Sequence, residues 1–225
     1  MRPFLQAGSI YGKVPEVIFC SRCKCIMACV RLRDRRGAGN GQPYPSEPAI
    51  LPMDPYNAIF RQVQLPPTCK GRLFLTGMPG RYHDIQEALE AWNELKAEVG
   101  KERMLLLSLV DEAEIRHKSP EYAKSIHAGL WEGERISCPI PDFGTPENEK
   151  AFRELIVDVA TALGSGANVV IHCGAGIGRT GMAAVCVLAA MGVPIKDATR
   201  VVRAAGSGPE TPEQAAVATR LFGPR

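Results

Sequence analysis

The stretch that decides the fold is His172-Cys173-Gly174-Ala175-Gly176-Ile177-Gly178-Arg179-Thr180-Gly181. It follows an apolar run, Ala167-Asn168-Val169-Val170-Ile171, that is typical of a buried parallel strand. An alanine-rich apolar run from Gly181 to Ala190 comes next and predicts a helix packed against the sheet. A strand, a glycine-rich loop and a helix N-terminus form an anion cradle, because unpaired backbone N–H groups and the positive end of the helix dipole point to one place.

Two side chains give this cradle its chemistry. Cys173 stands at the start of the loop, where the cradle favours the thiolate over the thiol. Arg179 stands at its end and can bind two oxygens of a phosphate through its planar fork. A lone free cysteine is usually a small buried hydrophobic residue, but the surrounding glycines and the arginine argue against that alternative here. A nucleophile and an oxyanion clamp in one cradle are what cleavage of a phosphate ester needs.

The motif resembles the signature of the protein tyrosine phosphatase superfamily: His-Cys, five residues, Arg, then Ser or Thr. Across residues 70–222 the chain looks most similar to the compact dual-specificity-like branch. The resemblance implies a phosphoprotein phosphatase that hydrolyses phosphotyrosine, with phosphoserine and phosphothreonine as further candidates, through a phosphocysteine intermediate. It also implies that Thr180 stabilises the departing thiolate. The implied phosphate-binding residues are Gly174, Ala175, Gly176, Ile177, Gly178 and Arg179.

Other enzyme classes explain the same residues less well. Gly176 to Gly181 also matches a dinucleotide-binding fingerprint, but Asp197, the acidic residue at the expected spacing, lies in a predicted helix start rather than at a strand end. Asp142-Phe143-Gly144 spells a kinase motif without the other kinase elements. Rhodanese-like or arsenate-reductase-like chemistry does not account for a separate acid loop. A phosphatase for a phosphoinositide or an RNA 5′-phosphate, and a phosphate-binding pseudophosphatase, remain as alternatives.

The proton for the leaving oxygen needs an acid, and Asp142 is the candidate. It lies in Cys138-Pro139-Ile140-Pro141-Asp142-Phe143-Gly144-Thr145-Pro146, a segment shaped by prolines and a glycine. The acid loop of the superfamily reads Trp-Pro-Asp, one residue, Gly, one residue, Pro, and this segment matches it except that Ile140 replaces the tryptophan. The alternative is that Asp142 only caps the following helix.

Two further residues have a structural and a functional interpretation. Gln214 matches, by placement, a glutamine of the superfamily that orients the hydrolytic water, and Thr211 with Gln214 also forms a capping box. His172 is assigned to support of the loop rather than to proton transfer.

Alternating strands and helices predict an α/β fold with a central, mostly parallel sheet of about four to five strands and helices on both faces, as in the phosphatases. We expect strands at Arg72–Thr76, Met104–Val110, near Ile136 and at 167–171, and helices at Asp84–Val99, Asp111–His127 and Glu147–Leu163, with three more after the loop.

Residues 1–52 differ from the rest of the chain. They carry eight Lys or Arg against three acidic residues, whereas residues 53–225 have a net charge of −2, so no basic nucleic-acid surface is expected on the domain. Cys20, Cys23, Cys25 and Cys29 fit no common zinc or iron–sulfur template well. We therefore expect residues 1–52 to be a poorly ordered or non-native extension, and residues 53–225 to be the phosphatase domain. No cofactor and no metal are expected.

The remaining expectations concern the setting of the protein. A nucleophilic cysteine must stay reduced, which favours a cytoplasmic location. No apolar run approaches the length of a membrane span, so no membrane partner is expected. The expected partner is a phosphorylated protein or peptide, bound by a monomer.

Overall fold

A five-stranded mixed sheet organises residues 58–224, which are the residues that the computed structural model describes. The strand order is β1-β2-β5-β3-β4. Strand β1 pairs antiparallel with β2, and the other neighbours are parallel. The expected fold class and strand number are confirmed. The strands are β1 (Arg61–Val63), β2 (Arg72–Thr76), β3 (Met104–Ser108), β4 (Glu134–Ser137) and β5 (Asn168–His172).

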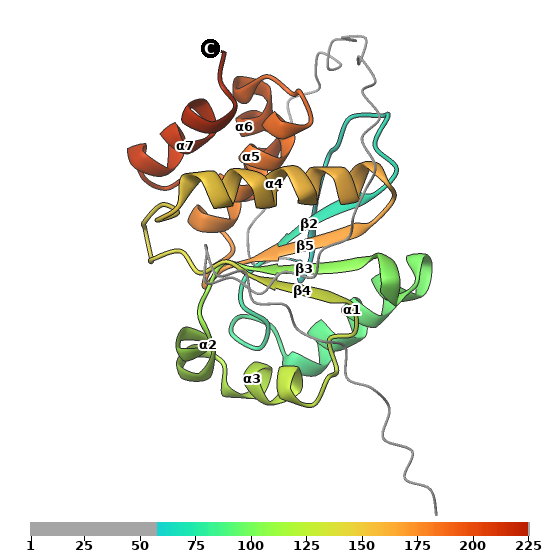
Figure 1. The fold of residues 1–225 in the computed structure, drawn as a ribbon. Coiled ribbons are helices and arrows are strands. Elements are labelled where there is room, and N and C mark those ends of the chain that lie inside the picture. Colours follow the sequence, from blue (N-terminus) through green and yellow to red (C-terminus); the bar gives the residue numbers. More distant parts are fainter. Residues whose placement is uncertain (1–57, 225) are drawn as a thin grey trace, which may run out of the picture.

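Helices cover both faces of the sheet (Figure 1). On one face lie α1 (Ile85–Val99), α2 (Glu112–Lys118) and α3 (Pro120–His127). On the other lie α4 (Glu149–Gly164), α5 (Gly178–Ala190), α6 (Ile195–Ala204) and α7 (Pro212–Phe222). A short 3₁₀ helix, η1 (Lys101–Arg103), precedes β3. Within residues 58–224 no helix is both long and apolar enough to cross a bilayer.

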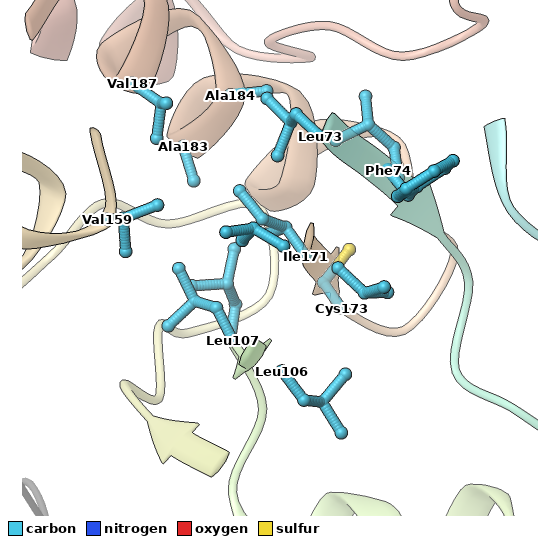
Figure 2. Packing of buried hydrophobic residues seen from close by; sticks show 14 of the residues in the cluster. Leu73, Phe74, Leu106, Leu107, Val159, Ile171, Cys173, Ala183, Ala184 and Val187 are labelled. Atoms are coloured by element: carbon cyan, nitrogen blue, oxygen red, sulfur yellow. The ribbon is translucent and has the colours of Figure 1, made fainter. Parts of the chain in front are cut away.

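Strand β5 lies in the middle of the sheet, and every residue of it is buried. Ile171 is in register with Leu75 of β2 and Leu107 of β3, so apolar side chains meet across three parallel strands. Figure 2 shows the small side chains Ala183 and Ala184 of α5 above Ile171 and Leu73 of the sheet, and small side chains let the helix approach the sheet closely. The carboxyl end of a central parallel strand is the usual place for a ligand site in such sheets. Here that end leads directly into Cys173.

The structure differs from the predicted elements in several places; α4, for example, begins at Glu149, two residues after the predicted start. The charged segment 111–127 is two helices, because Pro120 disfavours helical geometry at Ser119, which has φ −152° and ψ 78°. Strand β1 was not predicted, since three residues that include Arg61 and Gln62 give no apolar alternation. Strand β3 ends at Ser108, two residues before the predicted end.

Three expectations concern residues outside the described range. They are the nature of residues 1–52, the start of the domain at Met53 and the four-cysteine cluster. They stay predictions.

Candidate active site

The loop between β5 and α5 wraps around the sulfur of Cys173. The cysteine is buried, and the backbone N–H of Gly176 donates to its Sγ at 3.3 Å. Gly176 has φ +74°, and a Cβ added there would overlap the backbone of Thr76 and Gly77. A glycine is therefore required at this position both for conformation and for the close approach to β2.

Two side chains hold this loop from behind. Arg61 of β1, fully buried, donates from Nη2 to the carbonyl oxygen of Gly176 at 2.6 Å and from Nη1 to that of Ala205 at 3.1 Å. Ser207 donates from Oγ to the carbonyl oxygens of Gly176 at 3.1 Å and Ile177 at 2.8 Å. Binding the carbonyl groups fixes the loop conformation. Neither residue was predicted from the sequence, because neither belongs to a motif near the loop.

Arg179 is held by a carboxylate that was not predicted. Its side chain is only 2% exposed, and its two terminal nitrogens each donate to one oxygen of Glu114 at 3.0 Å. Nη1 also donates to the carbonyl oxygen of Ile140 at 3.0 Å. A bidentate pair fixes the plane of the guanidinium as well as its position. Glu114, in the first turn of α2, therefore orients the arginine.

The charge of Glu114 is strongly stabilised. Partial burial alone would raise the pKa of Glu114, but hydrogen bonds from Arg179 and Lys118 outweigh it and lower the pKa to about 2. Lys118 Nζ lies 2.8 Å from Oε1 of Glu114 and 3.8 Å from Oδ2 of Asp142. Two cations and two carboxylates thus form one cluster beside the loop.

Asp142 reaches this cluster from the predicted acid loop. Its Oδ1 lies 2.8 Å from Nη2 of Arg179, and its side chain is 56% exposed. It does not cap α4, because Asn148 is the N-cap residue and accepts from the N–H of Ala151 at 3.0 Å. The helix-cap alternative for Asp142 is therefore wrong. The next residue, Phe143, is exposed and has φ 55°, a left-handed conformation that is uncommon for a bulky side chain.

Gln214 connects the acid loop to α7. Its Nε2 donates to the carbonyl oxygen of Gly144 at 3.0 Å, and its Oε1 accepts from the N–H of Glu210 at 3.0 Å. Thr211 is the N-cap and accepts from the N–H of Gln214 at 3.1 Å, as the capping box predicts. The side chain of Gln214 does not complete that box with Thr211, because it binds the acid loop instead.

Thr180 and His172 are buried on either side of the loop. The Thr180 hydroxyl, in the first turn of α5, has no hydrogen-bond partner within residues 58–224. His172 Nδ1 lies 3.3 Å from the carbonyl oxygen of Cys173, and its Nε2 lies 3.2 Å from the Tyr122 hydroxyl. Burial lowers the pKa of His172 to about 4, so the ring is neutral near pH 7. A neutral histidine with a hydrogen-bond partner at each ring nitrogen suits the predicted role of supporting the loop.

The predicted site residues lie around the carboxyl end of β5, with Arg179 contacting Asp142 and Gln214 contacting the acid loop. In the described part of the chain, no group of three or more His, Cys, Asp or Glu side chains could hold a metal ion. The arrangement can bind an oxyanion, attack it with sulfur and donate a proton.

Comparisons with known proteins show that the fold occurs in solved phosphatase structures. Kinase associated phosphatase (KAP), in a structure with serine for its catalytic site cysteine, matches with a TM-score of 0.58 and 19% identity over 74% of this chain and 97% of that one. A glycine-to-alanine mutant form of Tk-PTP matches with a TM-score of 0.50 and 26% identity over 68% and 90%. No curated protein sequence matches.

A family model described as "Polymorphic toxin system, DSP-PTPase phosphatase" matches residues 76–193, more than half of the chain. That range includes the cradle, the acid loop and Glu114. The chain belongs to this family of phosphatases, which are of the dual-specificity and protein tyrosine phosphatase type.

Proposed function

We propose that this phosphatase hydrolyses phosphotyrosine in phosphorylated proteins, with Cys173 as the nucleophile. The observation that supports it most is the placement of the sulfur: Cys173 Sγ accepts the N–H of Gly176, and the same loop leads into Arg179, which meets Asp142 at 2.8 Å. Nucleophile, oxyanion clamp and acid thus converge at one end of the sheet.

In the first step, the Cys173 thiolate attacks phosphorus in line with the ester oxygen. The S–P bond forms as the P–O bond to the leaving group breaks. The backbone N–H groups of Gly174–Arg179, together with the Arg179 fork, hold the equatorial oxygens, where charge must be stabilised. Asp142 gives its proton to the leaving oxygen.

In the second step, water attacks phosphorus and the S–P bond breaks. The water proton goes to Asp142, and the Thr180 hydroxyl, which lacks a partner in the described structure, donates to the departing thiolate. Gln214 uses one N–H and one lone pair on the backbone of Gly144 and Glu210. Its amide retains a second N–H and a second lone pair, which suffice to orient a water.

The nucleophile also constrains where the enzyme works. A thiolate is oxidised readily, and a disulfide at Cys173 would remove the nucleophile. A reducing compartment such as the cytoplasm suits this chemistry.

The test is a turnover panel with purified full-length protein. Its substrates are phosphotyrosine, phosphoserine and phosphothreonine peptides, phosphoinositides and 5′-phosphorylated RNA, each compared with Cys173→Ser. Cys69→Ser is the matched control, because Cys69 is partly buried and bonds backbone carbonyls away from the loop. We expect phosphotyrosine peptides to give the highest kcat/KM, abolished only by Cys173→Ser. Preference for a phosphoinositide or RNA would overturn the substrate assignment, and no turnover at all would point to a pseudophosphatase.

A further inference from the structure

A second arginine reaches the rim of the cradle. Arg81 lies in the segment between β2 and α1. A Cβ added to Gly174 would lie 3.0 Å from Nη1 of Arg81, 3.1 Å from Nη2 of Arg179 and 3.1 Å from Oε1 of Glu114. Because both nitrogens lie about 3 Å from one point, they are at most ~6 Å apart. The missing side chain at Gly174 leaves room for the Arg81 head beside the arginine that binds phosphate.

Backbone contacts hold Arg81 in this position. The N–H of Met78 donates to the carbonyl oxygen of Gly174 at 3.2 Å, which ties the segment to the cradle. The N–H of Arg81 in turn donates to the carbonyl oxygen of Met78 at 3.1 Å, closing a turn. The guanidinium carbon of Arg81 lies 4.8 Å from the centre of the Tyr82 ring. Stacking on an aromatic face orients an arginine without neutralising its charge.

The ion pairs around the rim involve Arg179 and Lys118 and leave the charge of Arg81 available to bind an anion. Arg179 and Lys118 both pair with Glu114 and both lie near Asp142. Arg81 is exposed and forms no ion pair with a carboxylate in residues 58–224. Glu114 offsets part of the repulsion between the two guanidinium groups, but its oxygens already bind Arg179 and Lys118. A further anion beside Arg81 is therefore favourable.

We infer that Arg81 is a specificity residue that binds a second anionic group of the substrate, next to the phosphorylated side chain. The inference rests on the proposed function, in which a phosphopeptide occupies the cradle. Consecutive Cα atoms are about 3.8 Å apart, so a separation of at most ~6 Å between the two cations suits a group one or two positions away. The preferred substrate is therefore a phosphopeptide with a neighbouring carboxylate or second phosphate.

A peptide fits these charges better than a polyphosphorylated lipid headgroup. The loop residues between Cys173 and Arg179 are Gly, Ala, Gly, Ile and Gly, which add no cation. Arg81 thus supplies one extra positive charge at the rim, enough for one neighbouring anion. A headgroup with several phosphates would leave most of its charge without a partner.

The experiment varies one flanking residue and one arginine together. A phosphotyrosine peptide is made with Glu, Gln, Lys or phosphoserine at each of the two positions on either side of the phosphotyrosine. For each peptide, kcat/KM is measured for the wild type, Arg81→Ala and Arg81→Glu. Arg200→Ala is the charge control, because Arg200 on α6 forms a surface pair with Asp197 at 3.7 Å. Comparing Glu with phosphoserine distinguishes a carboxylate from a second phosphate.

We expect the wild type and Arg200→Ala to prefer the Glu peptide over the Gln peptide by about 3- to 10-fold at one of these positions, mainly through KM. Arg81→Ala should bring this ratio close to one. Arg81→Glu should reverse it, so that the Lys peptide becomes the better substrate. Raising the ionic strength should shrink the wild-type preference, because the contact lies at an exposed rim.

Failure of the inference and failure of the proposed function give different results. If the wild type hydrolyses none of the phosphopeptides, the proposed function is wrong. If the wild type hydrolyses them and the Glu-to-Gln ratio is the same in Arg81→Ala, only the inference is wrong. If a soluble inositol polyphosphate headgroup shows the larger dependence on Arg81, the assignment to a phosphopeptide is overturned.

Discussion

Nη2 of Arg179 lies 2.8 Å from Oδ1 of Asp142, so the residue proposed to bind phosphate also contacts the residue proposed to protonate the leaving group. Glu114 binds the same guanidinium through both of its oxygens and is much less exposed than Asp142. A substrate phosphate entering the cradle would replace the exposed carboxylate of Asp142 more readily than the partly buried carboxylate of Glu114. Glu114 therefore orients Arg179, whereas Asp142 is free to move from Arg179 to the leaving oxygen of the substrate.

The first prediction concerns the acid. Asp142→Asn should lower kcat by about 10²–10⁴ for substrates with poor leaving groups, because the amide cannot give up a proton. The loss should shrink for an activated aryl phosphate, whose leaving group needs little protonation. The measurement is kcat across a series of aryl phosphates of graded leaving-group pKa. An equal loss for every leaving group would mean that Asp142 is not the acid.

Glu210 provides the control for this experiment, since its carboxylate lies against Gly178 at the start of α5. Glu210→Gln removes a second exposed carboxylate near the cradle. If the loss of kcat depends on the leaving group in Glu210→Gln and not in Asp142→Asn, Glu210 rather than Asp142 is the acid.

A second prediction concerns Glu114. Glu114→Gln should lower kcat/KM by roughly 10–100-fold, because Arg179 loses a charged bidentate partner. Glu112→Gln, on the same helix but in a surface pair with Arg116, should change kcat/KM little. Parallel kinetics of the two variants check this. Equal effects of both substitutions would show that Glu114 does not orient Arg179.

The pKa of Glu114 predicts how this pair responds to acid. Its folded-state pKa of about 2 lies below the ordinary value of 4.5, so the pair adds stability above about pH 4.5 and loses it as the pH falls toward 2. Wild-type stability should therefore fall more steeply than that of Glu114→Gln between these two pH values. Urea unfolding at several pH values measures both. Identical slopes would mean that Glu114 is not paired in the folded protein.

A third prediction concerns His172. Its pKa of about 4 lies below the ordinary 6.5 because the ring is buried. The unfolded chain therefore binds a proton that the folded protein does not, and stability should fall as the pH drops through 6.5 toward 4. Between pH 7 and pH 5, protonation of His172 in the unfolded chain should lower the free energy of unfolding by about 1–2 kcal/mol.

Urea unfolding of His172→Asn at pH 7 and 5 checks this value, with His127→Asn as a control for an exposed histidine. The difference in stability between the two pH values should shrink only in His172→Asn. If the two variants and the wild type show the same difference, His172 is not neutral in the folded protein.

A fourth prediction follows from the sequence. A truncated chain that begins at Met53 should fold and keep full activity without added metal, because β1, the first described element, starts only at Arg61. The measurements are kcat/KM and thermal midpoint of both chain lengths, with metal analysis of the longer one. A stoichiometric metal in the full chain, together with a large drop in Tm on truncation, would show that the four cysteines form a structural site.

The part of the site that could be predicted is local in sequence. Cys173 and Arg179 share one loop, and the strand before it and the helix after it have clear apolar patterns. The segment 138–146 was predicted to be the acid loop because its prolines and glycine match a second short pattern. Each of these signals lies within about ten residues, where chain geometry alone places the side chains.

What could not be predicted depends on contacts between distant segments. Glu114 is 65 positions from Arg179, and Arg61 is 115 positions from Gly176, and neither residue belongs to a motif. Arg81 reaches the rim only because the segment after β2 turns back on the cradle. Pro120 is different, since its effect on the preceding residue was a signal that could have divided the charged helical segment into two.

The most direct measurement is identification of the covalent intermediate. Asp142→Asn is mixed with a radiolabelled, activated aryl phosphate. Such a substrate needs little acid to form the intermediate, and the variant lacks the base that would hydrolyse it. Quenched protein is digested, and the labelled residue is located by mass spectrometry. The account predicts phosphate on Cys173, none in the double variant with Cys173→Ser, and retained vanadate binding by Cys173→Ser. Label on another residue such as Cys186, or near-wild-type turnover by Cys173→Ser, would contradict it.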